Sequence, residues 1–191
     1  GAGTLGAAGG ATTVSGGTLD LGGTTQTQNG GVTLTGGIIQ NGTLSSSSTF
    51  ALQAGSVSAV LTGTGGIDKT TSGTVILSGA NNYSGGTTID AGTLQLGNGG
   101  TAGSITGDVT DNGTLAFSRS DGVVFAGAIS GSGGLSQVGA GTLTLTGANT
   151  YSGGTTISAG TLQGDTASLQ GNMTDDAALV FDQETDGTYA G

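Results

Sequence analysis

The chain has 191 residues, of which 44 are glycine, and it contains no proline, cysteine or histidine. Its 12 acidic and 2 basic residues give a formal net charge of −10. Without histidine or cysteine, Ser–His–Asp and Cys–His catalytic arrangements are excluded, as are His-ligated and thiolate zinc sites. Two basic residues are too few to neutralise a row of phosphates, so we expect no nucleic-acid binding.

The N-terminal part of the chain, positions 1–72, consists of short segments in which apolar residues alternate with Thr, Ser or Asp between glycines, as in residues 17–22, 31–36 and 42–45. A period of two places alternate side chains on opposite faces of a β-strand. The same alternation recurs after residue 72. We predict that one face carries Leu19, Leu21, Val32, Leu34, Val75, Leu77, Leu115, Phe117, Leu143 and Leu145, and the other carries Asp20, Thr33, Ile76, Ala116 and Thr144.

A long internal repeat follows. Residues 73–95 and 141–163 are identical at 18 of 23 positions, at an offset of 68. The match resumes at an offset of 64, where residues 107–117 align with 171–181. We therefore divide a single solenoid fragment, residues 1–191, into divergent rungs (1–72), a first repeat unit (73–140) and a second, truncated unit (141–191).

Near-verbatim repetition of this kind is typical of solenoids, in which each rung buries its apolar face only by stacking on its neighbours. Division of the 64–68-residue unit by three predicts rungs of about 21–23 residues, with three short strands each. The sequence thus predicts an all-β, three-sided parallel solenoid of about nine rungs. A flexible glycine-rich linker is the alternative, but only 7% of the residues are charged, which is low for a disordered segment.

The repeat also contains the corner sequence Tyr-Ser-Gly-Gly, at residues 83–86 and 151–154. Glycine suits a corner that needs positive φ or close approach of stacked backbones. Asn81 and Asn149 precede the two tyrosines, and we expect their amides to form ladders along the corner. The absence of proline fits interior rungs, because each needs its backbone N–H groups for pairing.

The segments at residues 77–89 and 145–157 closely resemble the autotransporter-associated β-strand repeat, also called the passenger-associated transport repeat. The resemblance implies a right-handed parallel β-helix in the passenger domain of a type V secreted protein. It also implies a C-terminal β-barrel translocator in the parent chain and a location on the cell surface or outside a Gram-negative bacterium. Members of the family are often adhesins or aggregation factors, and the repeat is thought to aid secretion and folding.

An enzymatic alternative remains, because many polysaccharide-processing enzymes are β-helices. Glycoside hydrolysis needs two carboxylates at a defined separation. The chain offers Asp108, Asp111, Asp121, Asp175, Asp176, Asp182, Glu184 and Asp186. It has no tryptophan to form a sugar platform, and Lys69 has glycine rather than serine three positions before it. We interpret the carboxylates as solvated corner residues.

Half of the acidic residues lie in the last 27 positions, where oxygen-rich turns favour calcium, although the Gly-Gly-x-Gly-x-Asp calcium repeat is absent. We predict no catalytic, cofactor-binding or metal-binding residues and no small-molecule cofactor. The leading hypothesis is a non-enzymatic structural or adhesive stalk whose partners are host-cell surfaces or other copies of itself. A self-assembling filament subunit is the other alternative.

Overall fold

The computed structural model describes residues 5–189, and in these residues all regular structure is β-strand. Short segments of alternating apolar and β-branched residues form strands, and the glycines between them form the corners. The strands are β1 (Thr12–Val14), β2 (Thr18–Thr27), β3 (Val32–Leu34), β4 (Ile38–Ser45), β5 (Phe50–Leu52), β6 (Gly55–Val57), β7 (Val60–Thr62), β8 (Ile67–Lys69), β9 (Thr74–Leu77), β10 (Thr87–Ile89), β11 (Thr93–Leu96), β12 (Val109–Asp111), β13 (Thr114–Phe117), β14 (Val123–Phe125), β15 (Ile129–Gly131), β16 (Gly134–Gln137), β17 (Thr142–Leu145), β18 (Thr150–Tyr151), β19 (Thr155–Ile157), β20 (Thr161–Gly164), β21 (Met173–Asp175) and β22 (Ala178–Phe181).

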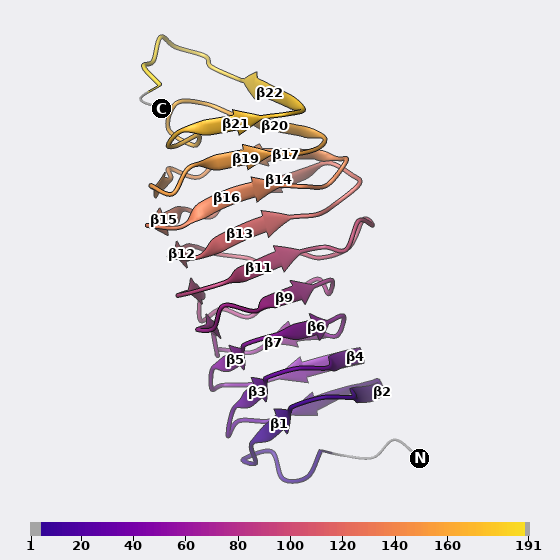
Figure 1. The fold of residues 1–191 in the computed structure, drawn as a ribbon. Helices are drawn as coiled ribbons and strands as arrows, with labels where there is room; N and C mark the ends of the chain where they lie inside the picture. The colour runs from indigo at the N-terminus through magenta and orange to yellow at the C-terminus, as the bar shows by residue number, and fades with distance from the viewer. Residues whose placement is uncertain (1–4, 190–191) are drawn as a thin grey trace.

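The strands stack into a rod whose N-terminal rungs lie at one end and C-terminal rungs at the other (Figure 1). Sheet 1 has the order β1-β3-β5-β8-β10-β12-β15-β18, and sheet 2 has the main path β2-β4-β6-β9-β11-β13-β16-β19-β21. Sheet 3 contains β14, β17, β20 and β22. The strand pairs are parallel, so the predicted all-β parallel solenoid is confirmed, with eight or nine rungs as counted along sheets 1 and 2.

The third side of the solenoid is built differently in its two halves. In the N-terminal half, β2 and β4 are long enough to continue round the corner. Their second parts pair with each other, and the second part of β4 also pairs with β7. A bulge between Asp20 and Thr24, which includes two glycines with positive φ, turns β2 at this corner. Further along, an isolated bridge between Ala80 and Ser104 lies on this side before sheet 3 begins at β14.

Rung length varies, and most rungs are shorter than the sequence predicts. Thr43 pairs with Val60, a spacing of 60 − 43 = 17, while Thr87 pairs with Val109, a spacing of 109 − 87 = 22. A spacing of 20, as between Thr12 and Val32, is common. The error arises because the 68-residue offset of the repeat is not a whole number of rungs, as shown below.

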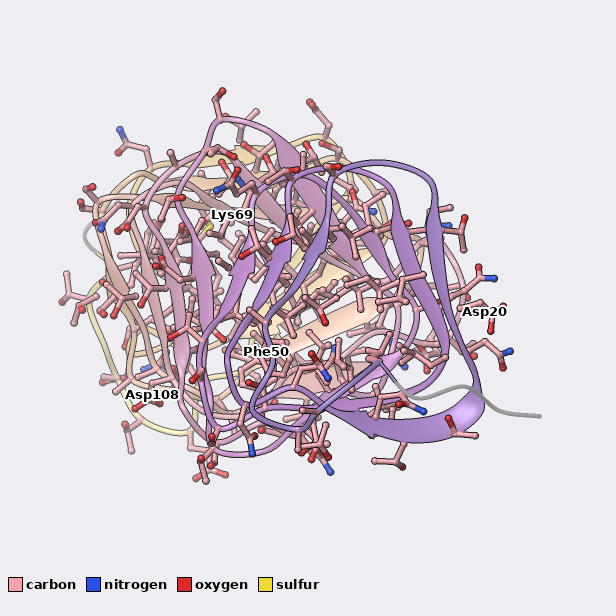
Figure 2. All side chains as sticks on the ribbon, turned by 90° about the horizontal axis from the view of Figure 1, so that it is seen from below. Asp20, Phe50, Lys69 and Asp108 are labelled. Atoms are coloured by element: carbon pink, nitrogen blue, oxygen red, sulfur yellow. The ribbon has the colours of Figure 1, made fainter. Side chains whose placement is uncertain are left out.

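The core is a column of apolar side chains along the axis of the solenoid. Viewed along that axis, Phe50 lies within the coil, whereas Asp20 and Asp108 lie at its outer edge (Figure 2). The ten residues predicted to share the inner face are buried, apart from Leu19, which packs partly buried against the core. Of the predicted outer residues, Asp20 is exposed, but Ala116 is buried in the surface of sheet 2 between Gln95 and Ser136. None of the described residues form a helix that would be long and apolar enough to cross a membrane.

Candidate functional site

The repeated segment forms a closed rung in each of its copies. In the first copy, Thr74 pairs with Thr93, a spacing of 93 − 74 = 19. In the second copy, Thr142 pairs with Thr161, and the spacing is the same, 161 − 142 = 19. The strands before them, β8 and β16, stack on β10 and β19 with spacings of 20. Each copy therefore carries its own stacking partners, from β8 to β11 in the first and from β16 to β20 in the second.

The two copies lie on different sides of the solenoid. Strands β9, β10 and β11 of the first copy lie in sheets 2, 1 and 2, with the tyrosine corner on the third side between β9 and β10. Their counterparts β17, β19 and β20 lie in sheets 3, 2 and 3. Thr74 pairs with β11, β11 pairs with β13, and β13 pairs with β16 at Gly134, so Thr74 and Gly134 are three rungs and 134 − 74 = 60 residues apart. Thr142 lies in β17, on the next side of the solenoid after Gly134. The 68-residue offset is thus three rungs plus one side.

Each repeat contains a buried tyrosine whose hydroxyl is paired with a threonine four positions later. The Tyr83 hydroxyl lies 2.7 Å from Thr87 Oγ1, and the Tyr151 hydroxyl lies 2.8 Å from Thr155 Oγ1. Both tyrosines are at most 2% exposed, and this burial raises the pKa of each phenol. The sequence indicated corner residues, and the structure places their rings in the core, where Phe50 lies 6.3 Å from the Tyr83 ring.

The two asparagines replace missing backbone pairs instead of forming amide ladders. Asn81 Oδ1 accepts a hydrogen bond from the Leu61 N–H at 2.9 Å, and its Nδ2 donates to Gly79 O and Ser104 O. Asn149 Oδ1 accepts from the Ile129 N–H at 2.7 Å. The predicted ladder is wrong because the two copies occupy different sides, so their asparagines are not stacked. Each side chain bridges rungs where the backbone turns a corner.

The Gly-Gly pairs are required by close backbone stacking. A Cβ at Gly85 would lie 2.3 Å from Gly66 N, and one at Gly153 would lie 2.5 Å from Gly133 C. Such distances are far below a van der Waals contact between heavy atoms, so a side chain at either position would push two rungs apart. In each repeat, a Gly-Gly pair therefore stacks on the Gly-Gly pair of the neighbouring rung. These glycines allow the rungs to pack closely, and they present no side chain for recognition.

Sequence reasoning missed the role of Lys69, which is fully buried. Its Nζ donates to the backbone carbonyls of Thr71 and Ala91. The residue 68 positions later, Gln137, is also buried, and its Nε2 donates to the carbonyls of Gly139 and Gly141. The shared bond to the carbonyl two positions ahead shows that both side chains cap a corner. The sequence feature that could have indicated this role is the alignment of Lys69 with Gln137 between the two repeats.

Asp111 and Asp175, the repeat-equivalent pair in the alternative catalytic set, do not come together. Asp111 is fully buried in sheet 1, and its oxygens accept hydrogen bonds from the Gly113 and Leu115 N–H groups. Asp175, its counterpart in the second unit, is exposed and lies in sheet 2. Burial raises the pKa of Asp111 to about 6, against the smaller lowering effect of its two backbone hydrogen bonds. A buried carboxylate with both oxygens occupied by the backbone does not reach a substrate.

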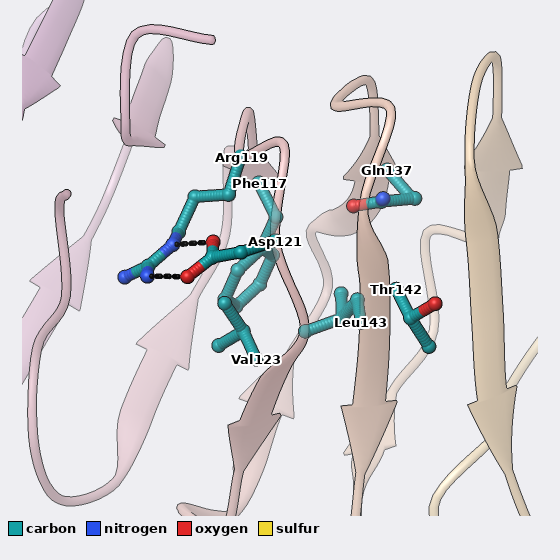
Figure 3. A pocket seen from close by; sticks show the side chains of 7 residues that line it. All are labelled: Phe117, Arg119, Asp121, Val123, Gln137, Thr142 and Leu143. Carbon is teal, nitrogen blue, oxygen red and sulfur yellow. Dashed lines mark hydrogen bonds and ion pairs between the residues drawn. The ribbon is translucent and has the colours of Figure 1, made fainter. Parts of the chain in front are cut away.

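The remaining acidic residues have local structural partners or are solvated. Asp121 forms an ion pair with Arg119, with Nη2 2.7 Å from Oδ2 and Nε 2.9 Å from Oδ1, beside a small hollow between rungs (Figure 3). This pair holds the pKa of Asp121 below its usual value. Arg119 also donates to the carbonyls of Thr101 and Gly103, which ties down the glycine-rich loop before β12. Asp108, Asp176, Asp182, Glu184 and Asp186 are exposed, and Asp182 accepts a hydrogen bond from Gln163.

The C-terminal group of acidic residues also fails to form a cluster. Among residues 5–189, no three acidic side chains lie close enough together to hold a metal ion. Asp165, the first of the group, accepts hydrogen bonds from Ser168 and from the Ala167 N–H, and the Ser168 bonds lower its pKa. These contacts are those of a local turn.

Comparison with known proteins identifies the repeat. The passenger-associated-transport-repeat family model matches residues 67–96 and 135–163. The chain is 45% identical over 178 residues to the adhesin BmaC autotransporter of Brucella suis biovar 1 (strain 1330). That alignment covers 80% of this chain and 5% of the relative, so the chain spans only a small part of the relative's length. No solved structure matches the chain.

The two matched segments coincide with the two self-stacking units of the solenoid, β8 to β11 and β16 to most of β20. Both segments contain the buried tyrosine, the bridging asparagine and the stacked glycines described above. The resemblance predicted from residues 77–89 and 145–157 is confirmed: the chain carries two passenger-associated transport repeats within a parallel β-solenoid.

Proposed function

We propose that this chain is a segment of an extracellular stalk in the passenger of an autotransporter, and that the stalk serves adhesion. The proposal rests on one observation: two transport repeats lie within a continuous stack of rungs that is similar to part of an autotransporter adhesin. The proposed location is the outer surface of a Gram-negative bacterium. A translocator domain in the parent chain and contacts with host-cell or like surfaces belong to the same proposal.

The packing suits a stiff rod. Each interior rung pairs with the rungs on both sides through parallel backbone hydrogen bonds, and the apolar column is continuous from Val14 to Leu169. In the described part of the chain, no buried side-chain nitrogen or oxygen lacks a hydrogen-bond partner. Bending the rod would break backbone pairs on one side and open the core on the other, which opposes deformation.

The repeats are also suited to folding during export, because each stacks on itself. Strand β11 pairs with β9, an earlier strand of the same repeat, so the loop that must close is short and its entropy cost is small. The segment from β8 to β11 brings two pairs of stacked strands with it. We propose that each repeat forms its rung as soon as it has emerged. The division of the chain at residues 72 and 140 stays part of this proposal.

We further propose that the segment is not an enzyme. The polysaccharide-processing alternative needs two carboxylates facing one groove, whereas Asp111 is buried and Asp175 lies on another sheet. Incubation of the purified chain with a panel of neutral and acidic polysaccharides, followed by measurement of new reducing ends, tests this point. Release of oligosaccharides that is abolished by Asp175→Asn would overturn it. Electron microscopy of the same sample tests the filament alternative, which predicts end-to-end fibres.

The adhesive function is tested by displaying residues 1–191 on the surface of a non-adherent bacterium. We expect increased attachment to host cells or increased clumping over a strain that displays an unrelated β-solenoid of similar length. Equal attachment and equal clumping of the two strains would refute the adhesive role of this segment.

The transport role needs deletions that respect the rungs. Removal of residues 74–92 or 142–160 takes out one complete rung and joins positions that occupy the same place in successive rungs. We expect each deletion to leave a foldable rod but to slow its appearance on the cell surface. As a control, removal of residues 114–133 takes out one rung between the same positions of β13 and β16 without removing a repeat corner. Equal export of all three variants would refute the role of the repeats.

A further inference from the structure

The carboxyl group of Asp111 occupies an unusual position at the corner between sheets 1 and 2. Its residue is fully buried, and its oxygens accept hydrogen bonds from Gly113 N at 2.9 Å and Leu115 N at 3.2 Å. The next rung lies directly on it, since a Cβ at Gly133 would be only 2.6 Å from the carboxyl carbon. The glycine at position 133 therefore makes the space in which this carboxyl group is enclosed.

Among the residues that the structure describes, no cation lies against this carboxyl group. In the column of sheet 1 that contains Asp111, the neighbour on one side is Ile89 and the neighbour on the other side is Gly131. The strands packed around it, β10, β13, β15 and β16, contain no charged or titratable side chain. Lys69 lies one strand beyond Ile89, with its Nζ bound to carbonyl groups.

Two exposed carboxylates flank the column. Asp90 follows β10, and Asp108 precedes β12, where it accepts a hydrogen bond from the Ala128 N–H. Both carry the same charge as ionised Asp111, so neither favours its ionisation. The favourable contacts of the Asp111 carboxylate are thus two hydrogen bonds from neutral N–H groups. These two bonds must offset the free-energy cost of removing the charged carboxylate from water.

From this geometry we propose that Asp111 acts as a pH-sensitive element that makes the middle rungs of the rod more stable in mildly acidic than in neutral solution. When the carboxyl group is protonated, it fits the enclosed corner as a neutral group. When it loses its proton, a charge is enclosed between two rungs, and stacking of β12 and β13 on β15 and β16 is weakened. The structural unit that responds is the glycine-rich corner of residues 111–113 and 131–134.

The direction of the effect follows from proton linkage. The pKa of Asp111 is about 6 in the folded chain, against 3.8 for an ordinary aspartate, because burial outweighs the two hydrogen bonds. Between these two values the folded state binds more protons than the unfolded state, so stability falls as the pH rises. A difference of about two pKa units corresponds to an about 100-fold lower ratio of folded to unfolded chain above pH 6 than below pH 4.

The test compares the wild-type chain with Asp111→Asn and Asp175→Asn. Both variants remove one negative charge, so they match in their effect on the general repulsion of this acidic chain. Asp175 Oδ1 accepts the N–H of the residue two positions later, as Asp111 Oδ1 does, but Asp175 is exposed. Unfolding in guanidinium chloride is followed between pH 3.5 and pH 7.5, and amide hydrogen exchange at residues 109–117 reports on the corner itself.

We expect the ratio of folded to unfolded chain to change by about 100-fold less across this pH range in Asp111→Asn than in the wild type. Asp175→Asn should retain the wild-type profile. An unchanged profile in Asp111→Asn would overturn the proposal. Should that variant fail to fold, the carbon-13 resonance of the Asp111 carboxyl group in the wild-type chain decides: a titration midpoint near 6 supports the proposal, and a midpoint at or below 4 overturns it.

Discussion

The equivalence of Lys69 and Gln137 leads to a prediction that is opposite to the usual effect of changing a buried side chain. We expect Lys69→Gln to be at least as stable as the wild type, with a gain of about 1 kcal/mol, because it removes a buried ammonium group whose desolvation opposes folding. Glutamine at this position in the second repeat donates to the carbonyl two positions ahead at 2.9 Å, so the same bond to Thr71 O is available in the first.

The size of this gain is set by two opposing contributions. Lys69 donates to two carbonyls, and hydrogen bonds from a charged donor contribute about 1.5–3 kcal/mol each. Against them stands the cost of burying an ammonium group, which amounts to several kcal/mol. Burial lowers the pKa of Lys69, as expected for an ammonium group that has been removed from water. Replacement by a neutral donor therefore retains part of the bonding and removes the larger cost.

The assay is unfolding in guanidinium chloride at pH 7, with Lys69→Met as the matched control that fills the space but donates no hydrogen bond. We expect Lys69→Met to lose about 2 kcal/mol, because two carbonyls at the corner lose their donor. Gln137→Lys, the reciprocal change, should be destabilised by about 1–3 kcal/mol because it encloses a charge. If Lys69→Gln were as unstable as Lys69→Met, the corner-capping role of this position would be refuted.

The pH dependence of the wild type provides a second check. A lysine whose folded pKa is lowered binds fewer protons in the folded than in the unfolded state as the pH approaches 10.5. The wild type should therefore gain stability as the pH rises through the lowered pKa toward 10.5, and lose it again as the pH falls. Lys69→Gln should lack this rise. If the stability of both proteins rose equally with pH, the rise would come from titratable groups other than Lys69.

Three further sets of substitutions test the packing of the rod, by thermal or denaturant unfolding and, for Arg119, also by proteolysis. Tyr83→Phe and Tyr151→Phe should each cost about 1–2 kcal/mol, because each removes the hydrogen bond between the tyrosine and a buried threonine hydroxyl, and the two losses should add since the sites are several rungs apart. Tyr151→Phe should cost the less of the two, because Thr155 keeps its hydrogen bond to Gln170 O. Gly85→Ala should cost more than about 2 kcal/mol, whereas Gly100→Ala, with no atom within 4 Å of its added Cβ, should be within about 0.5 kcal/mol of the wild type. Arg119→Met should leave the unfolding midpoint nearly unchanged but increase proteolysis of the loop that Arg119 holds, and unchanged proteolysis would contradict this role.

The inner and outer faces of the strands were predictable because the side-chain period in a strand is fixed at two. Val75 and Leu77 are buried and Ile76 between them is half-buried, as the alternation indicates. The stacking of such strands in parallel followed from the near-verbatim repeat. These features depend on local geometry and on the need of each rung for a neighbour, both of which the sequence contains directly.

The rung length was not predictable in the same way, because a repeat offset counts positions along the chain and not turns of the solenoid. Corners absorb different lengths of chain, as the spacings of 17 from Thr43 to Val60 and 22 from Thr87 to Val109 show. The division of the offset by three assumed that each repeat returns to the same side. The structure shows a return after three rungs plus one side, and only the strand registers contain that information.

The positions of the polar side chains were the hardest to predict. Asp111 and Asp175 align in sequence and make the same bond to the N–H two positions ahead, yet one is buried and the other exposed. The difference is whether another rung covers the corner, which depends on the part of the chain that forms the next turn. Asn81 likewise looked like a member of a ladder, because its sequence neighbours do not show which side of the solenoid its copy occupies.

The second repeat is rotated by one side about the solenoid axis relative to the first, yet it makes the same internal contacts. The same tyrosine, asparagine and glycine contacts form on the third side in the first copy and in sheet 1 in the second. The repeat is therefore defined by the rung it makes with itself and is independent of its place around the axis. Each copy brings a partner strand with it, because its last strand pairs with an earlier strand of the same repeat. That property suits a rod that is assembled in order from one end, since each unit needs only the rung already formed beneath it.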